Sequence, residues 1–130
     1  MATGLSSTVA NAILDAYCRS VAWSEPAAFW VQLHVGDPGS VGTANAAGET
    51  TRKQITFSAA SGGAISNSAD VIWTNYPNGT DTISHISFWD ASTSGTFIGS
   101  DALNNSRSPA SGDTLRLATG SLNLTLPIAA

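Results

Sequence analysis

The first periodic segment of the chain has the hydrophobic pattern of a helix. Val9, Ile13 and Tyr17 recur at every fourth position, and each is followed directly by a further apolar residue. This spacing places an apolar stripe along one side of a helix. The serine pair at 6–7 precedes the stripe, and a serine side chain can cap a helix by accepting a backbone hydrogen bond. We therefore predict a helix over residues 7–20, the only helix that the sequence indicates.

The rest of the chain alternates between apolar and polar positions with a period of two, which is the pattern of half-buried strands. Residues 29–35 (FWVQLHV) show this clearly, since every second side chain is a large apolar group. Turn residues such as those of GDPGS at 36–40 separate the segments. The expected strands span 29–35, 52–58, 64–74, 82–90, 96–100, 113–118 and 121–128. Long polar loops are expected at 36–51 and 104–112.

Seven short strands with frequent turns predict a mainly β protein, an antiparallel β-sandwich or small barrel with one N-terminal α-helix at an end or edge. The length of 130 residues fits a single domain spanning residues 1–130. The alternating residues that should form the core are Val31, Leu33, Ile55, Phe57, Ile86, Phe88, Leu115, Leu117, Leu122, Leu124 and Leu126.

Composition narrows the class of protein. Charged residues make up 11% of the chain, against roughly 25% in an average soluble protein. The net charge of −4 and the five basic residues argue against direct nucleic-acid binding, which needs clustered Lys and Arg to neutralise phosphates. No apolar run approaches the roughly 20 residues that span a bilayer, so no membrane partner is expected. No signal peptide is visible, and synthesis in a cytoplasm follows.

The sequence offers no catalytic, metal-binding or cofactor-binding constellation. His34 and His85 each lie within an expected strand, and neither has the further ligands that a zinc site needs. We interpret both as structural residues on polar strand faces. The aspartates lie singly near turns, where Asp bonds its local backbone. The single cysteine, Cys18, is interpreted as a small buried hydrophobe.

The tryptophans are the candidate interface residues. The chain has four, at Trp23, Trp30, Trp73 and Trp89. Trp30 and Trp89 fall on strand faces opposite the core-forming residues, so something must cover them. One interpretation is that the N-terminal helix covers them. The other is that they mark contacts between subunits, since the cores of interfaces are enriched in Trp.

Several motifs together resemble a known family. They are LHVGDPG at 33–39 followed by GTAN at 42–45, RKQITFSAASGGAISNSADVIW at 52–73, ISHISFWDA at 83–91, and the closing segment at 112–126. This pattern resembles small virion proteins of tailed bacteriophages, especially those of actinobacteria, over nearly the whole chain. The resemblance implies a non-enzymatic structural protein of the virion, made in the host bacterial cytoplasm.

The resemblance leaves the place in the virion open. We expect a capsid decoration protein that binds and stabilises the shell of the major capsid protein, because a lone compact domain has little reach. The alternative within the family is a minor tail or tail-fibre protein. A carbohydrate-binding module, stacking sugars on Trp30 or Trp89, is the alternative from another class. We further expect a homotrimer held by apolar and small polar contacts, and three copies are what the resemblance implies.

Overall fold

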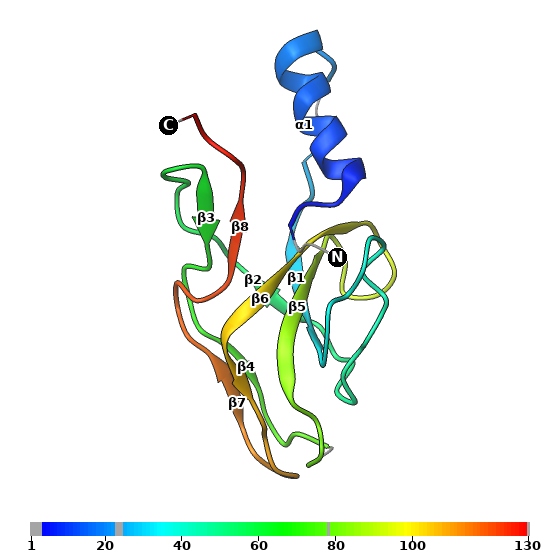
Figure 1. Ribbon diagram of the computed structural model, residues 1–130, viewed down its shortest axis with the longest axis vertical. Coiled ribbons are helices and arrows are strands. Elements are labelled where there is room, and N and C mark those ends of the chain that lie inside the picture. Colours follow the sequence, from blue (N-terminus) through cyan, green and yellow to red (C-terminus); the bar gives the residue numbers. More distant parts are fainter. Residues whose placement is uncertain (1–3, 23–24, 78, 130) are drawn as a thin grey trace.

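The described residues form three antiparallel sheets. The computed structural model describes residues 4–22, 25–77 and 79–129 (Figure 1). The largest sheet has the strand order β2-β1-β5-β6, formed by β1 (Phe29–His34), β2 (Lys53–Ile55), β5 (Ile83–Trp89) and β6 (Phe97–Arg107). The two smaller sheets each pair two strands, β3 (Ala64–Ser66) with β8 (Asn123–Thr125) and β4 (Val71–Trp73) with β7 (Leu115–Leu117). The predicted mainly β sandwich is confirmed, and the sheets do not close into a barrel.

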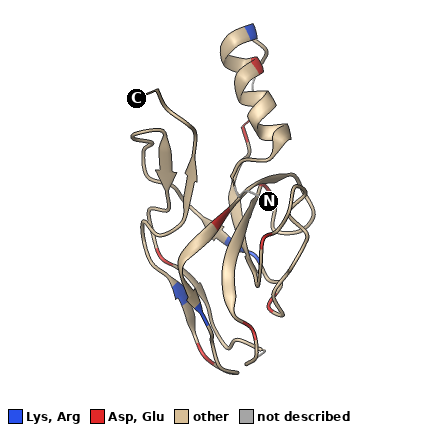
Figure 2. Ribbon diagram, viewed as in Figure 1, with Lys and Arg blue, Asp and Glu red and all other residues tan. Residues whose placement is uncertain are grey.

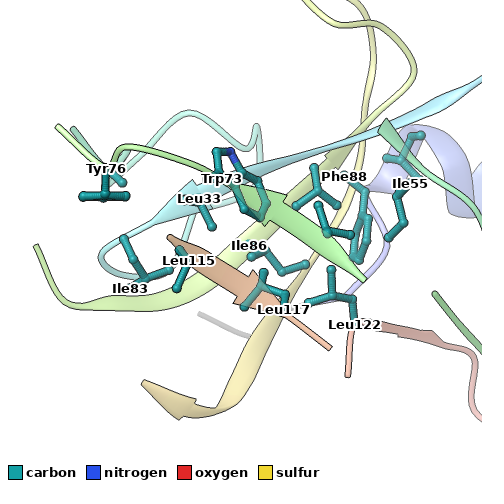
Figure 3. Packing of buried hydrophobic residues seen from close by; sticks show 14 residues of the cluster. Leu33, Ile55, Trp73, Tyr76, Ile83, Ile86, Phe88, Leu115, Leu117 and Leu122 are labelled. Atoms are coloured by element: carbon teal, nitrogen blue, oxygen red, sulfur yellow. The ribbon is translucent and has the colours of Figure 1, made fainter. Parts of the chain in front are cut away.

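The core lies between the four-stranded sheet and the strands that face it. Leu33 of β1 lies close to Trp73 of β4 and to Leu115 and Leu117 of β7, and all of these side chains are buried (Figure 3). Val31 of β1 is buried in the same cluster. The contacts join residues about 40 or more positions apart in the sequence, since β4 and β7 lie far from β1 along the chain. The period-two alternation therefore selects the inward face correctly on both layers.

Eight of the predicted core residues are buried as expected. These are Val31, Leu33, Ile55, Ile86, Phe88, Leu115, Leu117 and Leu122. Phe57 and Leu124 are partly buried and pack against this cluster. The prediction for Leu126 is wrong, because its side chain remains 44% exposed. The reason is that β8 ends at Thr125, so the alternation of the last segment continues past the point where the strand is paired.

The predicted helix is α1 (Ser7–Arg19). The side chain of Ser6 accepts a hydrogen bond from the backbone N–H of Val9 at 3.2 Å, as expected of an N-cap. Ser20, at φ 56°, ends the helix in the left-handed conformation. None of the residues of α1, all of which the structure describes, is buried. The prediction that Cys18 is buried is therefore wrong, and this thiol is exposed.

All the strands differ from their predicted bounds by at least one residue, and the two largest differences concern the segment 64–74 and β6. The segment 64–74 divides into β3 and β4, because the chain bends at Ser68 and Ala69 between them. The Asn67 side chain donates to the carbonyl oxygens of Ala69 and Ala118 and accepts from the N–H of Leu122. In contrast, β6 continues to Arg107 through the start of the predicted loop at 104–112. β6 lies at the edge of its sheet, where one face meets water, so its polar sequence is compatible with a strand.

The outer face of the four-stranded sheet is covered by the chain's own loop at 36–51. The loop is held to β1, since the N–H of Ala47 donates to the carbonyl of Leu33. Gly42, at φ 79°, lies so close to the ring of Phe97 that a Cβ would have no room. The interpretation that the helix covers this face is therefore wrong. Figure 1 shows α1 standing away from the sheet at one end of the molecule.

Candidate functional site

A cavity lies between α1 and the β3–β8 pair. We call it the α1 groove; it has a volume of about 640 Å³ and is open to solvent. Its lining includes seven residues from α1, β3 and β8 and from the segment after β8. They are Thr8, Val9, Ala12, Ile13, Ile65, Leu124 and Leu126. The groove thus collects apolar side chains from the N-terminal helix, from β3 in the middle of the chain and from the last segment.

The surroundings of the groove carry almost no charge. Among the described residues that line it, the charged ones are Asp15 on α1 and Asp90 after β5, and both are acidic. Figure 2 shows the β3 and β8 ribbons without a charged residue. A surface of this kind offers a partner apolar contact and little else. Large apolar patches on a protein usually mark an interaction site.

The side of α1 that faces away from the groove is also apolar. We call it the outer face, formed by Leu14, Tyr17 and Cys18. Successive residues of a helix are about 100° apart, so Leu14 and Tyr17 lie roughly opposite the groove-lining Thr8 and Ala12. Leu14 is 60% exposed and Tyr17 is 91% exposed. A helix that is apolar on two opposite sides needs something to cover both.

The opposite wall of the groove is held by β3 and β8. Ile65 pairs with Leu124 across these strands, and the N–H of Leu126 donates to the carbonyl of Gly63 at 2.7 Å. Gly63 has φ 75°, a backbone conformation that residues with a side chain rarely adopt. A Cβ there would also meet the carbonyl oxygen of Leu126 at 2.7 Å. Glycine at this position therefore lets the last segment approach and keeps Leu126 at the groove.

The predicted tryptophan set does not come together as a surface. Trp73 is buried in the core, where its Nε1–H donates to the carbonyl of Thr51. Trp89 is buried against the ring of Phe97, and the guanidinium of Arg52 lies 4.0 Å from its ring centroid. These two residues are therefore covered by their own chain, which corrects the expectation that they mark a subunit contact and that Trp89 offers a sugar platform.

Of the other two tryptophans, the structure describes Trp30 but not Trp23. Trp30 is half-buried on β1, where it pairs with Gln54 of β2 and with Trp89 of β5. It therefore keeps part of its ring surface available. Trp23 lies outside the described residues. The part of the candidate interface that stays a prediction is thus reduced to Trp30 and Trp23.

His34 is a buried structural residue, in line with its interpretation from the sequence. Its Nδ1 lies 2.8 Å from the carbonyl oxygen of Ala44, and its Nε2 lies 2.7 Å from the Oγ of Ser87. A carbonyl oxygen only accepts, so Nδ1 carries the proton and Nε2 accepts from Ser87. The Oγ of Ser87 in turn accepts from the Nε1–H of Trp89. Every group in this network has a partner when His34 is neutral.

His85 is the other histidine, and it has a partner on its own strand. His85 is half-buried and its Nδ1 lies 2.8 Å from the Oγ of Ser84. Across the part of the chain that the structure describes, no group of three or more His, Cys, Asp or Glu residues could hold a metal ion. Within the same residues, no helix has the length and apolar character needed to cross a membrane.

Sequence reasoning missed the groove, although it identified the stripe on α1. The groove residues that it did not recognise are Ile65, Leu124 and Leu126. The sequence places all three in strands and predicts the two leucines to be core residues. A signal was present in the last segment, where the alternation of Leu122, Leu124, Leu126 and Ile128 is longer than the short partner strand near 64–66. Apolar residues beyond a paired strand are candidates for an exposed contact.

One comparison with known proteins gives the family. The family model described as Podophage GP4 fiber I protein gp80 matches residues 4–125. No curated protein matches the chain. Because the match covers nearly the whole chain, the chain belongs to this family of phage fibre proteins, and it is a structural component of the virion. The resemblance to a phage virion protein is confirmed at this level, and the description favours the fibre alternative over capsid decoration.

Proposed function

We propose that this member of the podophage fibre family is a non-enzymatic structural subunit of a phage fibre. The observation that carries the proposal is the family match over residues 4–125. The exposed apolar end of the molecule supports it, since α1 and the β3–β8 pair offer a protein-docking surface rather than a place for chemistry. The occupied nitrogen atoms of His34 support it as well, because this side chain has a structural role.

The proposal includes assembly of identical chains, with a homotrimer as the expected form. Low charge supports contacts made by apolar surface, because the five basic residues allow few ion pairs. Two of the basic residues already form exposed pairs within the chain, Arg19 with Asp15 and Arg116 with Asp70. Exposed ion pairs contribute only about 0–1 kcal/mol each.

Localisation of the chain in the virion tests the proposed function. Antibodies against the purified protein would be coupled to gold particles and applied to intact virions, with preimmune antibodies as the control. Gold particles on the fibres would support the proposal. Gold particles distributed over the head would overturn it in favour of capsid decoration, and absence of the chain from purified virions by mass spectrometry would overturn a virion role altogether.

A further inference from the structure

Residues 4–6 add a short strand to β6, which lies at the edge of the four-stranded sheet. Leu5 forms an antiparallel bridge with Gly99. We call residues 97–100 of β6 the acceptor edge, and residues 4–19, which comprise the short strand and α1, the N-terminal arm. We propose that the acceptor edge also receives the N-terminal arm of a second copy of this chain, so that neighbouring copies exchange arms. The inference rests on the proposed assembly of identical chains.

The acceptor edge is shaped for the close approach of a particular backbone. A Cβ at Gly99, which is buried, would lie 2.7 Å from the carbonyl oxygen of Gly4 and 3.1 Å from the Cα of Leu5. Gly4 itself has φ 141°, a backbone conformation that residues with a side chain rarely adopt. A glycine on each side of the contact therefore lets the two backbones meet. The occupant that fits is a segment with the sequence of residues 4–6.

Main-chain hydrogen bonds hold the short strand to the acceptor edge. The N–H of Ser6 donates to the carbonyl oxygen of Ile98 at 2.8 Å. The N–H of Ser100 donates to the carbonyl oxygen of Gly4, also at 2.8 Å. Strands that join an open sheet edge bind through such main-chain bonds. An arm from a second copy has the same backbone groups, so it forms the same two bonds.

The rest of the N-terminal arm has little contact with its own chain. All residues of α1 are described, and none of them is buried. The α1 groove separates α1 from the β3–β8 pair. A second hollow, of about 170 Å³, lies between the start of the arm and the loop residues Gly39 and Ser40. The short strand is therefore the main attachment of the arm, and release of the arm breaks few contacts.

The segment that joins the arm to β1 permits exchange. Residues 20–28 connect α1 to β1, and the first three of them are exposed. A segment of this length spans up to roughly 30 Å when extended, about twice the radius of gyration of a domain of this size. Ser20 has φ 56°, which is unfavourable for a residue with a side chain. Strain in a connecting segment favours the exchange of a terminal element between copies.

Assembly brings a second acceptor edge close to each arm. Partners that are linked in one assembly meet at effective concentrations in the millimolar range. An arm that leaves its own edge then meets an identical edge on the neighbouring copy. Exchange of identical elements is a low-cost route to symmetric oligomers, and a ring of three copies closes when each arm passes to the next copy.

Complementation between two variants of the full chain tests the exchange. The arm-defective chain carries Ser6→Pro, which removes the N–H that bonds Ile98, and the φ of −65° at Ser6 suits proline. The edge-defective chain carries Gly99→Ala, whose Cβ opposes binding of the arm. Each variant alone has only defective contacts. A mixture holds intact edges on the first variant and intact arms on the second, and only exchange between chains joins them.

The readout is hydrogen exchange of the Ser100 amide, which bonds Gly4, in an isotope-labelled Ser6→Pro chain. Alone, this amide should exchange roughly tenfold faster than in the wild type. Unlabelled Gly99→Ala chain at about 1 mM should restore most of the protection, since a contact with a dissociation constant of about 0.1 mM is then about 90% occupied. Exchange that stays fast in the mixture would overturn the proposal and show that each arm serves its own chain.

Three controls isolate the strand contact. Ser6→Ala keeps the N–H and loses only the cap of α1, and Ser7→Pro places proline at the first helical position, where it is tolerated. Both should keep the exchange of Ser100 close to that of the wild type. The unlabelled double variant Ser6→Pro/Gly99→Ala has no intact arm and should restore no protection. Protection by this double variant would also overturn the proposal.

Circular dichroism checks the folding of each variant. If Gly99→Ala is unfolded, Ser100→Pro takes its place as the edge-defective chain. It removes the N–H that bonds Gly4, and proline is accepted on edge strands. All measurements use purified protein, so they are independent of where the chain lies in the virion, and either proposal can fail without the other.

Discussion

The Nε2 atom of His34 lies 2.7 Å from the Oγ atom of Ser87, across two neighbouring strands, and neither side chain is exposed to solvent. The carbonyl oxygen of Ala44, which only accepts and lies 2.8 Å from the Nδ1 of His34, fixes the direction of the protons in this network. The indole of Trp89 donates to Ser87, Ser87 donates to His34, and His34 donates to the carbonyl of Ala44. The network joins β1, β5 and the loop at 36–51 beneath the surface.

The buried His34 predicts that the protein loses stability as the pH falls. Desolvation by burial lowers the pKa of His34 from 6.5, and it outweighs the backbone groups of Ala44 and Asn45, which raise the pKa. Below 6.5 the unfolded chain therefore binds a proton more readily than the folded chain. The stabilisation is complete above the unfolded pKa and is lost as the pH falls through the folded one.

Urea unfolding between about pH 8 and pH 5 measures this dependence. His34→Gln should flatten the decline in the free energy of unfolding, although it lowers stability at neutral pH. His85→Gln is the comparison variant. The charge of His85 also lowers the pKa of His34, so this change should weaken the decline only in part, and less than His34→Gln does. An unchanged pH dependence in His34→Gln would contradict the prediction.

Removal of the Ser87 hydroxyl should destabilise the protein by about 1–3 kcal/mol, because it leaves the Nε1–H of Trp89 and the Nε2 of His34 buried without their partner. The control is Ser100→Ala. Ser100 faces Ser87 across β5 and β6 and is also buried, but its hydroxyl accepts a long bond of 3.4 Å from Gly4. Urea midpoints should fall further for Ser87→Ala than for Ser100→Ala, and equal losses would argue against the network.

Two leucines near the end of the chain should respond differently to truncation. Leu122 is fully buried, so Leu122→Ala should cost about 2–5 kcal/mol of unfolding free energy. Leu126 is exposed in the groove, and Leu126→Ala should change the free energy by about 0.5 kcal/mol or less in a monomer. Chemical denaturation at low protein concentration measures both. A large loss for Leu126→Ala would mean that this side chain is packed.

Gly63 and Gly62 separate two effects of a glycine replacement. Both have positive φ, 75° and 60°, so alanine at either position is strained by roughly 1–2 kcal/mol. A Cβ at Gly63 would in addition lie 2.5 Å from the Cγ2 of Ile128, whereas the space at Gly62 is open. Gly63→Ala should therefore be the more destabilising change. It should also speed the hydrogen exchange of the Leu126 amide, which bonds the Gly63 carbonyl, and Gly62→Ala should not.

The local sequence was sufficient to predict the helix and the strands, and to predict many of the side chains that point into the core. The stripe on α1 and the serine before it located the helix, because a cap and a 3.6-residue period depend on neighbouring residues alone. For the same reason the alternation identified Val31 and Leu33 of β1 and Ile86 and Phe88 of β5 as inward-pointing. It placed Ile83 on the opposite face, although Ile83 is buried in the core, because β5 shifts its register between Ile83 and His85. Asp37 also bonds its local backbone, the N–H of Gly39, as turn aspartates do.

Tertiary structure decided which of the apolar faces are covered and by what. A period shows which side chains share a face, but the cover comes from segments that are distant in sequence. Trp89 is hidden by Arg52 and Phe97, which a search for exposed tryptophans could not foresee. Leu14 and Leu126 are left open because the one helix stands away from the sheet and the last strand ends early. The sequence determined the apolar residues of α1 and of the β3–β8 pair, and only the folded chain placed them on opposite sides of the α1 groove.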